Sequence, residues 1–140
     1  MDLFTLFTLI AAGFSGATMG SFLLVTLLYN ALLKQTDNIT NKLFIYRRLY
    51  RLNTALSILG GICAALTNNR PAALMLAILG ASYVFNHAHI LKGLVKTCNT
   101  QYQVVNMRHY RGLSSLQNLM HLGQFFAAGY CIYLLGITTL

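Results

Sequence analysis

The chain opens with an uncharged segment of 31 residues, 3–33, whose sequence is LFTLFTLIAAGFSGATMGSFLLVTLLYNALL. An α-helix needs about 20 predominantly apolar residues to cross the roughly 30 Å hydrocarbon core of a bilayer. The residue before the segment, Asp2, is acidic, whereas a secretory signal peptide begins with basic residues. The segment therefore predicts a retained transmembrane helix.

Three more segments lack Lys, Arg, Asp and Glu: residues 52–69, 71–91 and 112–140, which are 18, 21 and 29 residues long. The 140-residue chain has 56% apolar and 9% charged residues, whereas soluble domains carry about 25% charged residues. This composition excludes a secreted module, a soluble enzyme and a sequence-reading DNA-binding domain. We expect an all-α integral membrane protein, one transmembrane domain over residues 1–140 that forms a four-helix bundle. The predicted spans are residues 3–33, 49–67, 71–95 and 108–138.

The net charge of +8 is distributed unevenly between the predicted loops. Nine of the ten cations lie in the first and third connections, and only Arg70 lies in the second. The positive-inside rule then places both basic connections in the cytoplasm and both termini outside it. We expect a bacterial inner-membrane protein whose partners include membrane lipids and no nucleic acid. The cations expected at lipid headgroups are Arg47, Arg48, Arg51, Arg108 and Arg111.

Each predicted span also carries amide or imidazole side chains near its basic end. Such groups are costly in hydrocarbon and usually face the interior of a bundle. Gln117, His121 and Gln124 share one face of the fourth span. We therefore predict a polar layer in the cytoplasmic third of the bundle, formed by Asn30, Asn53, Asn86, His87, Gln117, Asn118, His121 and Gln124.

The polar layer admits more than one interpretation. Its side chains can simply bond one another, in which case no cofactor is bound, and this is our first expectation. Alternatively, His87 or His89 on the third span and His121 on the fourth are candidate ligands for haem b or a metal ion. The same layer is also a candidate site for a quinone or another lipophilic ligand.

Small residues recur at helical spacing within the spans, and catalytic sets are missing from them. The candidate packing residues are Gly16, Gly20, Gly61, Ala77, Ala81 and Gly123, which would let helices approach closely within the bundle or on another subunit. The only carboxylate side chains, Asp2 and Asp37, lie outside the spans, so no carboxylate pair is available for buried acid–base work. We expect no catalytic activity from this chain alone.

Two stretches resemble the transmembrane-protein-205-like family of small four-helix membrane proteins. They are residues 44–52, FIYRRLYRL, followed by LSILGG at 56–61, and residues 109–114, HYRGLS, followed by QNL at 117–119. The resemblance implies the four-helix topology and supplies no catalytic residue. Members often have a proline at the end of the first helix, where this chain has NALL at 30–33. The anthrone-oxygenase-like membrane proteins share the layout with fewer matching residues.

The sequence leaves three classes of function open. The leading expectation is a noncatalytic accessory or structural subunit of a larger membrane complex, because the chain offers packing ridges and little surface outside the membrane. The second is a redox subunit that binds haem, metal or quinone through His87, His89 and His121. The third is a small transporter or lipid-handling protein whose cavity is the polar layer.

Overall fold

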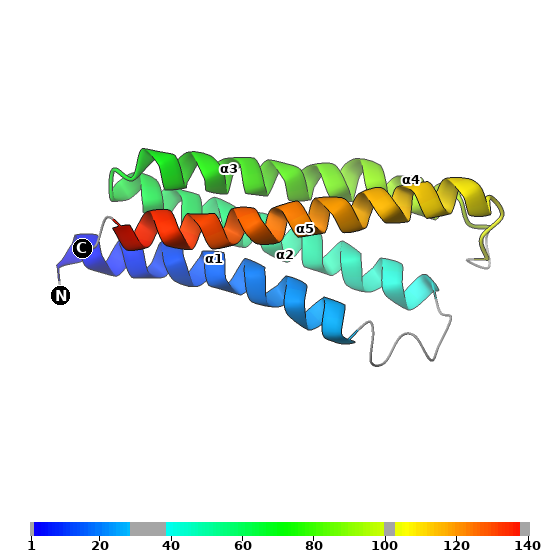
Figure 1. The fold of residues 1–140 in the computed structure, drawn as a ribbon, viewed down its shortest axis with the longest axis horizontal. Coiled ribbons are helices and arrows are strands. Elements are labelled where there is room, and N and C mark those ends of the chain that lie inside the picture. Colours follow the sequence, from blue (N-terminus) through cyan, green and yellow to red (C-terminus); the bar gives the residue numbers. More distant parts are fainter. Residues whose placement is uncertain (1, 29–38, 100–102, 138–140) are drawn as a thin grey trace.

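A computed structural model describes residues 2–28, 39–99 and 103–137. Within these ranges the chain is helical apart from short turns and one isolated bridge between Cys98 and Val104. Its helices are α1 (Leu3–Leu28), α2 (Ile39–Leu66), α3 (Arg70–Phe85), the π-helix η2 (Asn86–Leu91), α4 (Lys92–Lys96) and α5 (Met107–Ile137). α3, η2 and α4 follow one another without a break, so the described helices form four long rods (Figure 1). All four are long and apolar enough to cross a membrane, as the sequence predicts.

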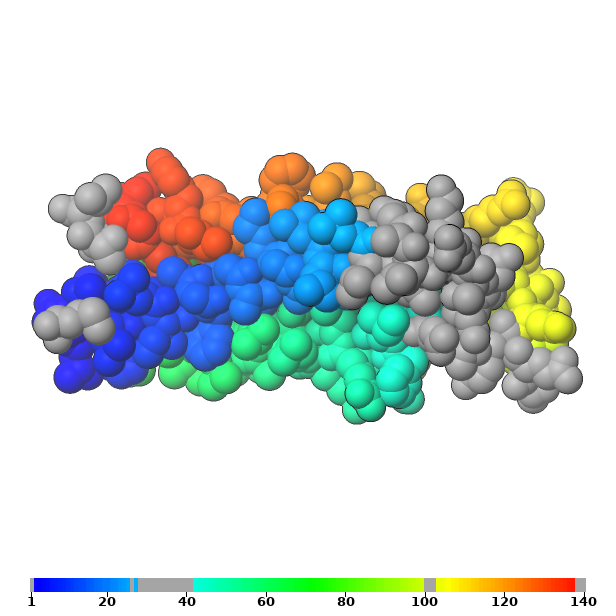
Figure 2. Space-filling model, turned by 90° about the horizontal axis from the view of Figure 1, so that it is seen from below, coloured from blue at the N-terminus to red at the C-terminus, as the bar shows by residue number. Residues whose placement is uncertain are grey.

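The rods pack as a square bundle. α1 lies against α2 and α5, and α3 lies against the same two helices, so α1 and α3 occupy opposite corners. Figure 2 shows the α1 face, with α5 along its upper edge and α2 along its lower edge. α1 begins and α5 ends at one end of the bundle (Figure 1). We call the opposite end, where α2 and α5 begin and α4 ends, the basic end.

The connection between α2 and α3 is a tight turn at the other end. Asn68 has a φ of 54°, the left-handed conformation that asparagine tolerates better than most residues. Asn69 follows, and its side-chain oxygen accepts the backbone N–H of Ala72, 3.2 Å away, which caps α3. The Asn69 Nδ2 group donates to the carbonyl of Leu134 in α5 at 3.2 Å. One side chain therefore begins α3 and fastens it to α5.

The helix bounds agree with the predicted spans at most ends. The third rod, Arg70–Lys96, and α5 each lie within one residue of the prediction. α2 begins at Ile39 rather than at residue 49, because the amphipathic stretch before the span joins the same helix. The π-helical segment was not predicted, since a single wide turn leaves the apolar pattern on both sides intact. Residues 29–33 of the first predicted span lie outside the described residues.

Most of the packing residues predicted from small-residue spacing make no close contact within this bundle. A methyl group added at Gly16, Gly20 or Gly123 would meet no described atom within 4 Å, and Ala77 and Ala81 are exposed. Gly61 does face α3, 3.6 Å from the Leu76 side chain by the same measure. A methyl group added at the neighbouring residue, Gly60, would lie 3.2 Å from the Phe14 Cβ atom of α1. Helical spacing identifies residues that share one face of a helix. Inward and outward faces repeat with the same period, so the spacing does not tell which face packs in the bundle.

Candidate functional site

A buried polar cluster lies across the bundle between α2 and α5, with Tyr50 at its centre. The Tyr50 side chain is fully buried. Gln117 Nε2 donates to the Tyr50 hydroxyl at 2.6 Å, and His121 Nε2 lies 2.8 Å from the same oxygen. Because α2 and α5 occupy opposite corners, a long side chain is needed to join them, and tyrosine has the necessary length.

His121 is the second partner of the Tyr50 hydroxyl. The hydroxyl oxygen accepts from Gln117, and the histidine tautomer decides which atom donates in the bond between Tyr50 and His121. The His121 ring is stacked on Tyr46, with centroids 5.3 Å apart, and the edge of Phe22 lies against it at 5.7 Å. His121 is thus held by packing and by one hydrogen bond.

The two other rods contribute polar contacts on either side of Tyr50. In α1, Ser21 Oγ donates to Asn53 Oδ1 of α2 at 2.9 Å. In α5, Gln124 Nε2 donates to Ser82 Oγ of α3 at 2.8 Å. Several buried atoms of the cluster have no hydrogen-bond partner within the described part of the chain: Asn53 Nδ2, Ser57 Oγ, both side-chain atoms of Asn86, Gln117 Oε1 and Gln124 Oε1.

The structure places the predicted polar layer as follows. Asn53, Asn86, Gln117, His121 and Gln124 are all buried. Asn118 is exposed, so its assignment to the interior is wrong: it follows Gln117 by one residue, and neighbouring residues on a helix face different sides. Asn30 lies outside the described residues.

Sequence reasoning missed Tyr50. It belongs to a buried stripe of α2 formed by Tyr46, Tyr50, Asn53 and Ser57, which are spaced i, i+4, i+7 and i+11. That spacing marks one helix face and could have located the residue. Aromatic residues in a span are usually assigned to lipid or core, so the hydroxyl was not counted as a polar group.

The three histidines proposed as ligands do not gather at one place. His121 is bonded to Tyr50, His89 is exposed and stacked on Phe85 at 4.8 Å, and His87 lies between α2 and η2 beside a cavity that neither of the others lines. Among the described residues no group of three or more His, Cys, Asp and Glu could hold a metal ion. Ligation of a haem by His121 Nε2 would require the hydrogen bond between this atom and the Tyr50 hydroxyl to break.

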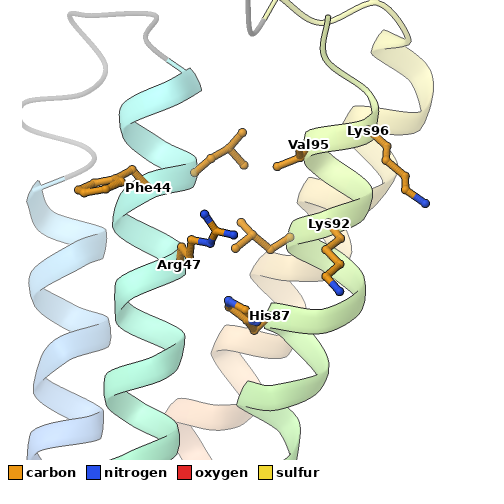
Figure 3. Close-up of a pocket in the computed structure, with 8 residues that line it drawn as sticks. Phe44, Arg47, His87, Lys92, Val95 and Lys96 are labelled. Atoms are coloured by element: carbon orange, nitrogen blue, oxygen red, sulfur yellow. The ribbon is translucent and has the colours of Figure 1, made fainter. Parts of the chain in front are cut away.

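The cavity beside His87 is a groove between α2 and the η2–α4 part of the third rod (Figure 3). Its volume is about 370 Å³. Arg47 of α2 and His87 of η2 extend toward each other across it, whereas the side chains of Lys92 and Lys96 start at the rim and extend away from α2 (Figure 3). The other four lining residues are apolar. We call this cavity the basic groove; its lining residues are Leu43, Phe44, Arg47, His87, Leu91, Lys92, Val95 and Lys96.

The cations of the basic groove have no carboxylate partner in the described part of the chain. The one Asp or Glu described there is Asp2, which lies at the other end of the bundle. Arg48 is stacked on the ring of Phe44, 4.3 Å from its centroid, and so holds one wall of the groove in place. Arg51 is also close enough to His87 to act on it electrostatically. The groove therefore combines a strong positive potential with an apolar surface.

The position of the groove along the bundle follows from the lengths of the rods. About 20 residues cross the hydrocarbon core. Counted from Leu66, Arg70 and Ile137 at the far ends, such a stretch ends near Arg47, His89 and Asn118. The groove extends to both sides of this level.

No protein-family model, curated protein or solved structure matches the chain. The resemblance to the transmembrane-protein-205-like family stays a prediction.

Proposed function

We propose that the protein is an integral membrane protein that binds an anionic amphiphile in the basic groove. The observation that carries the proposal is the lining of the groove. Three cations adjoin four apolar side chains there, and these cations have no carboxylate partner among the described residues. An anionic headgroup satisfies the cations, and an acyl chain covers the apolar wall. This is the lipid-handling class that the sequence left open, with the site at the groove rather than in the polar layer.

The neighbouring polar cluster supports this function as a scaffold. His87 lines the groove and Asn86, the preceding residue, is fully buried toward the bundle interior. Both belong to η2, whose wide turn changes the direction of successive side chains. Tyr50 and its partners join α2 to α5 across the bundle, one turn further along α2 than Arg47. We infer that the cluster fixes the spacing of the helices that form the groove.

Native mass spectrometry of the purified protein in a neutral detergent tests the proposal. We expect phosphatidylglycerol to bind more tightly than phosphatidylcholine, and the preference to fall in an Arg47→Gln/Lys92→Gln variant. Arg108→Gln is the matched control, because Arg108 is an exposed cation of the basic end that does not line the groove. An unchanged preference in the double variant, with the control behaving as the parent, would contradict the proposal.

We further propose that the basic end faces the cytoplasm of a bacterial inner membrane. The support is the charge distribution: eight of the nine described Lys and Arg residues belong to α2, α4 and α5 at or near that end, and Arg70 alone lies at the other. A role as an accessory subunit of a larger complex stays a prediction.

A further inference from the structure

The charge of the basic groove exceeds that of an ordinary anionic lipid. Arg47, Lys92 and Lys96 line it, and Arg48 and Arg51 lie beside it. A phosphodiester lipid such as phosphatidylglycerol brings one negative charge. A phosphate monoester brings about −1.5 to −2 at pH 7, because its second pKa is about 6. The larger charge balances more of the groove.

The donors of the groove also suit a phosphate with free oxygens. A phosphate monoester exposes three oxygens that accept hydrogen bonds, whereas a diester has two unesterified oxygens. Arg47 presents a planar fork of N–H groups, and Lys92 and Lys96 carry ammonium groups on flexible stems that can turn inward from the rim. His87 faces Arg47 and adds an imidazole ring (Figure 3), whose buried Nε2 atom has no hydrogen-bond partner within the described residues. Arg47 comes from α2 and the other three residues from the third rod, and the two lysine side chains extend away from Arg47 (Figure 3).

The size of the groove favours a small headgroup. A cavity of about 370 Å³ is near the lower end of the roughly 300–1,000 Å³ found for ligand sites. Part of that space lies along the apolar side chains of Leu43, Leu91 and Val95, where an acyl chain would pack. A small headgroup leaves more of this space to the acyl chain.

We infer that the ligand of the basic groove is an amphiphile with a terminal phosphate monoester, of the phosphatidic acid type, recognised by Arg47, His87, Lys92 and Lys96. The inference rests on the proposed function, since it names the headgroup of the same site. The apolar wall assigns the source of the phosphate to a lipid rather than to a soluble phosphate ester.

The test compares phosphatidic acid with phosphatidylglycerol of the same acyl chains, by native mass spectrometry at pH 7.4. One additional negative charge beside interfacial cations is worth about a fivefold change in affinity, so we expect phosphatidic acid to bind about fivefold more tightly. In Lys92→Gln the ratio should fall toward one, and in Arg108→Gln it should stay at the parental value. If Lys92→Gln folds poorly, the same ratio is measured in Lys96→Gln, because Lys96 is exposed at the rim of the groove.

The outcomes separate this inference from the proposed function. Equal affinities for the two lipids, both lost in Arg47→Gln/Lys92→Gln, would overturn the monoester assignment and leave anionic amphiphile binding intact. No dependence of either lipid on the groove residues would overturn both. Glycerol 3-phosphate at the same concentration should not displace bound phosphatidic acid, and displacement by it would overturn the assignment to a lipid.

Discussion

Replacement of Tyr50 by phenylalanine removes one oxygen atom from the centre of the buried polar cluster and keeps the ring. That oxygen accepts from Gln117 at 2.6 Å and is bonded to His121 at 2.8 Å, so two hydrogen bonds between α2 and α5 are lost together. Side-chain hydrogen bonds within membranes average about 0.6 kcal/mol and reach about 1.7 kcal/mol. We therefore expect the free energy of unfolding to fall by about 1–3 kcal/mol.

Reversible unfolding in mixed micelles of a mild detergent and dodecyl sulfate, followed by circular dichroism, measures this change. Tyr133→Phe is the matched control, because Tyr133 is 62% exposed on the outer face of α5. A double-mutant cycle with Gln117→Met should give a coupling of about 0.6–1.7 kcal/mol between positions 50 and 117. A Tyr50→Phe effect equal to that of Tyr133→Phe would refute the view that this cluster holds α2 to α5.

Three further predictions concern packing, capping and topology. Gly60→Ala should destabilise the protein by about 1 kcal/mol, because the new methyl group lies 3.2 Å from a side-chain carbon of α1. The new methyl group of Gly123→Ala meets open space, so this variant should not be destabilised. Thermal unfolding of both variants measures the difference. Asn69→Ala removes the α3 cap and a bond to α5, and should reduce the unfolding free energy by about 1–2 kcal/mol; a loss below that of Gly123→Ala would contradict the capping role. In a cysteine-free background, a membrane-impermeant maleimide added outside intact cells should label Asp2→Cys and miss Val105→Cys, which is 75% exposed; the reverse pattern would invert the proposed orientation.

The four rods were predictable because the information lies in the sequence pattern itself. An uncharged, apolar stretch such as residues 3–33 is most stable in the hydrocarbon core of a bilayer. Because no water is available there, the backbone must form its hydrogen bonds within a helix. The buried amides followed from the same reasoning, as Asn86 and Gln117 would be costly against lipid and are found fully buried.

The rest depended on which residues meet across the bundle. The pairing of Tyr50 with Gln117 and His121 joins residues 67 and 71 positions apart, and helix spacing contains no information about that contact. The basic groove likewise arises from the approach of α2 to η2 and α4, two segments whose cations the sequence assigned only to topology and headgroup attraction. Small-residue spacing misled for a related reason, since it cannot tell an inward face from an outward one.

Photolabelling with a lipid tests the central claim most directly. Phosphatidic acid with a photoreactive acyl chain is incorporated into nanodiscs that contain the protein, and the labelled peptides are identified by mass spectrometry. The groove predicts labelling concentrated at Leu43, Phe44, Leu91 and Val95 and reduced by Arg47→Gln/Lys92→Gln. Labelling spread evenly over lipid-facing side chains such as Leu119, which is 67% exposed, and unchanged by the double variant would contradict the account.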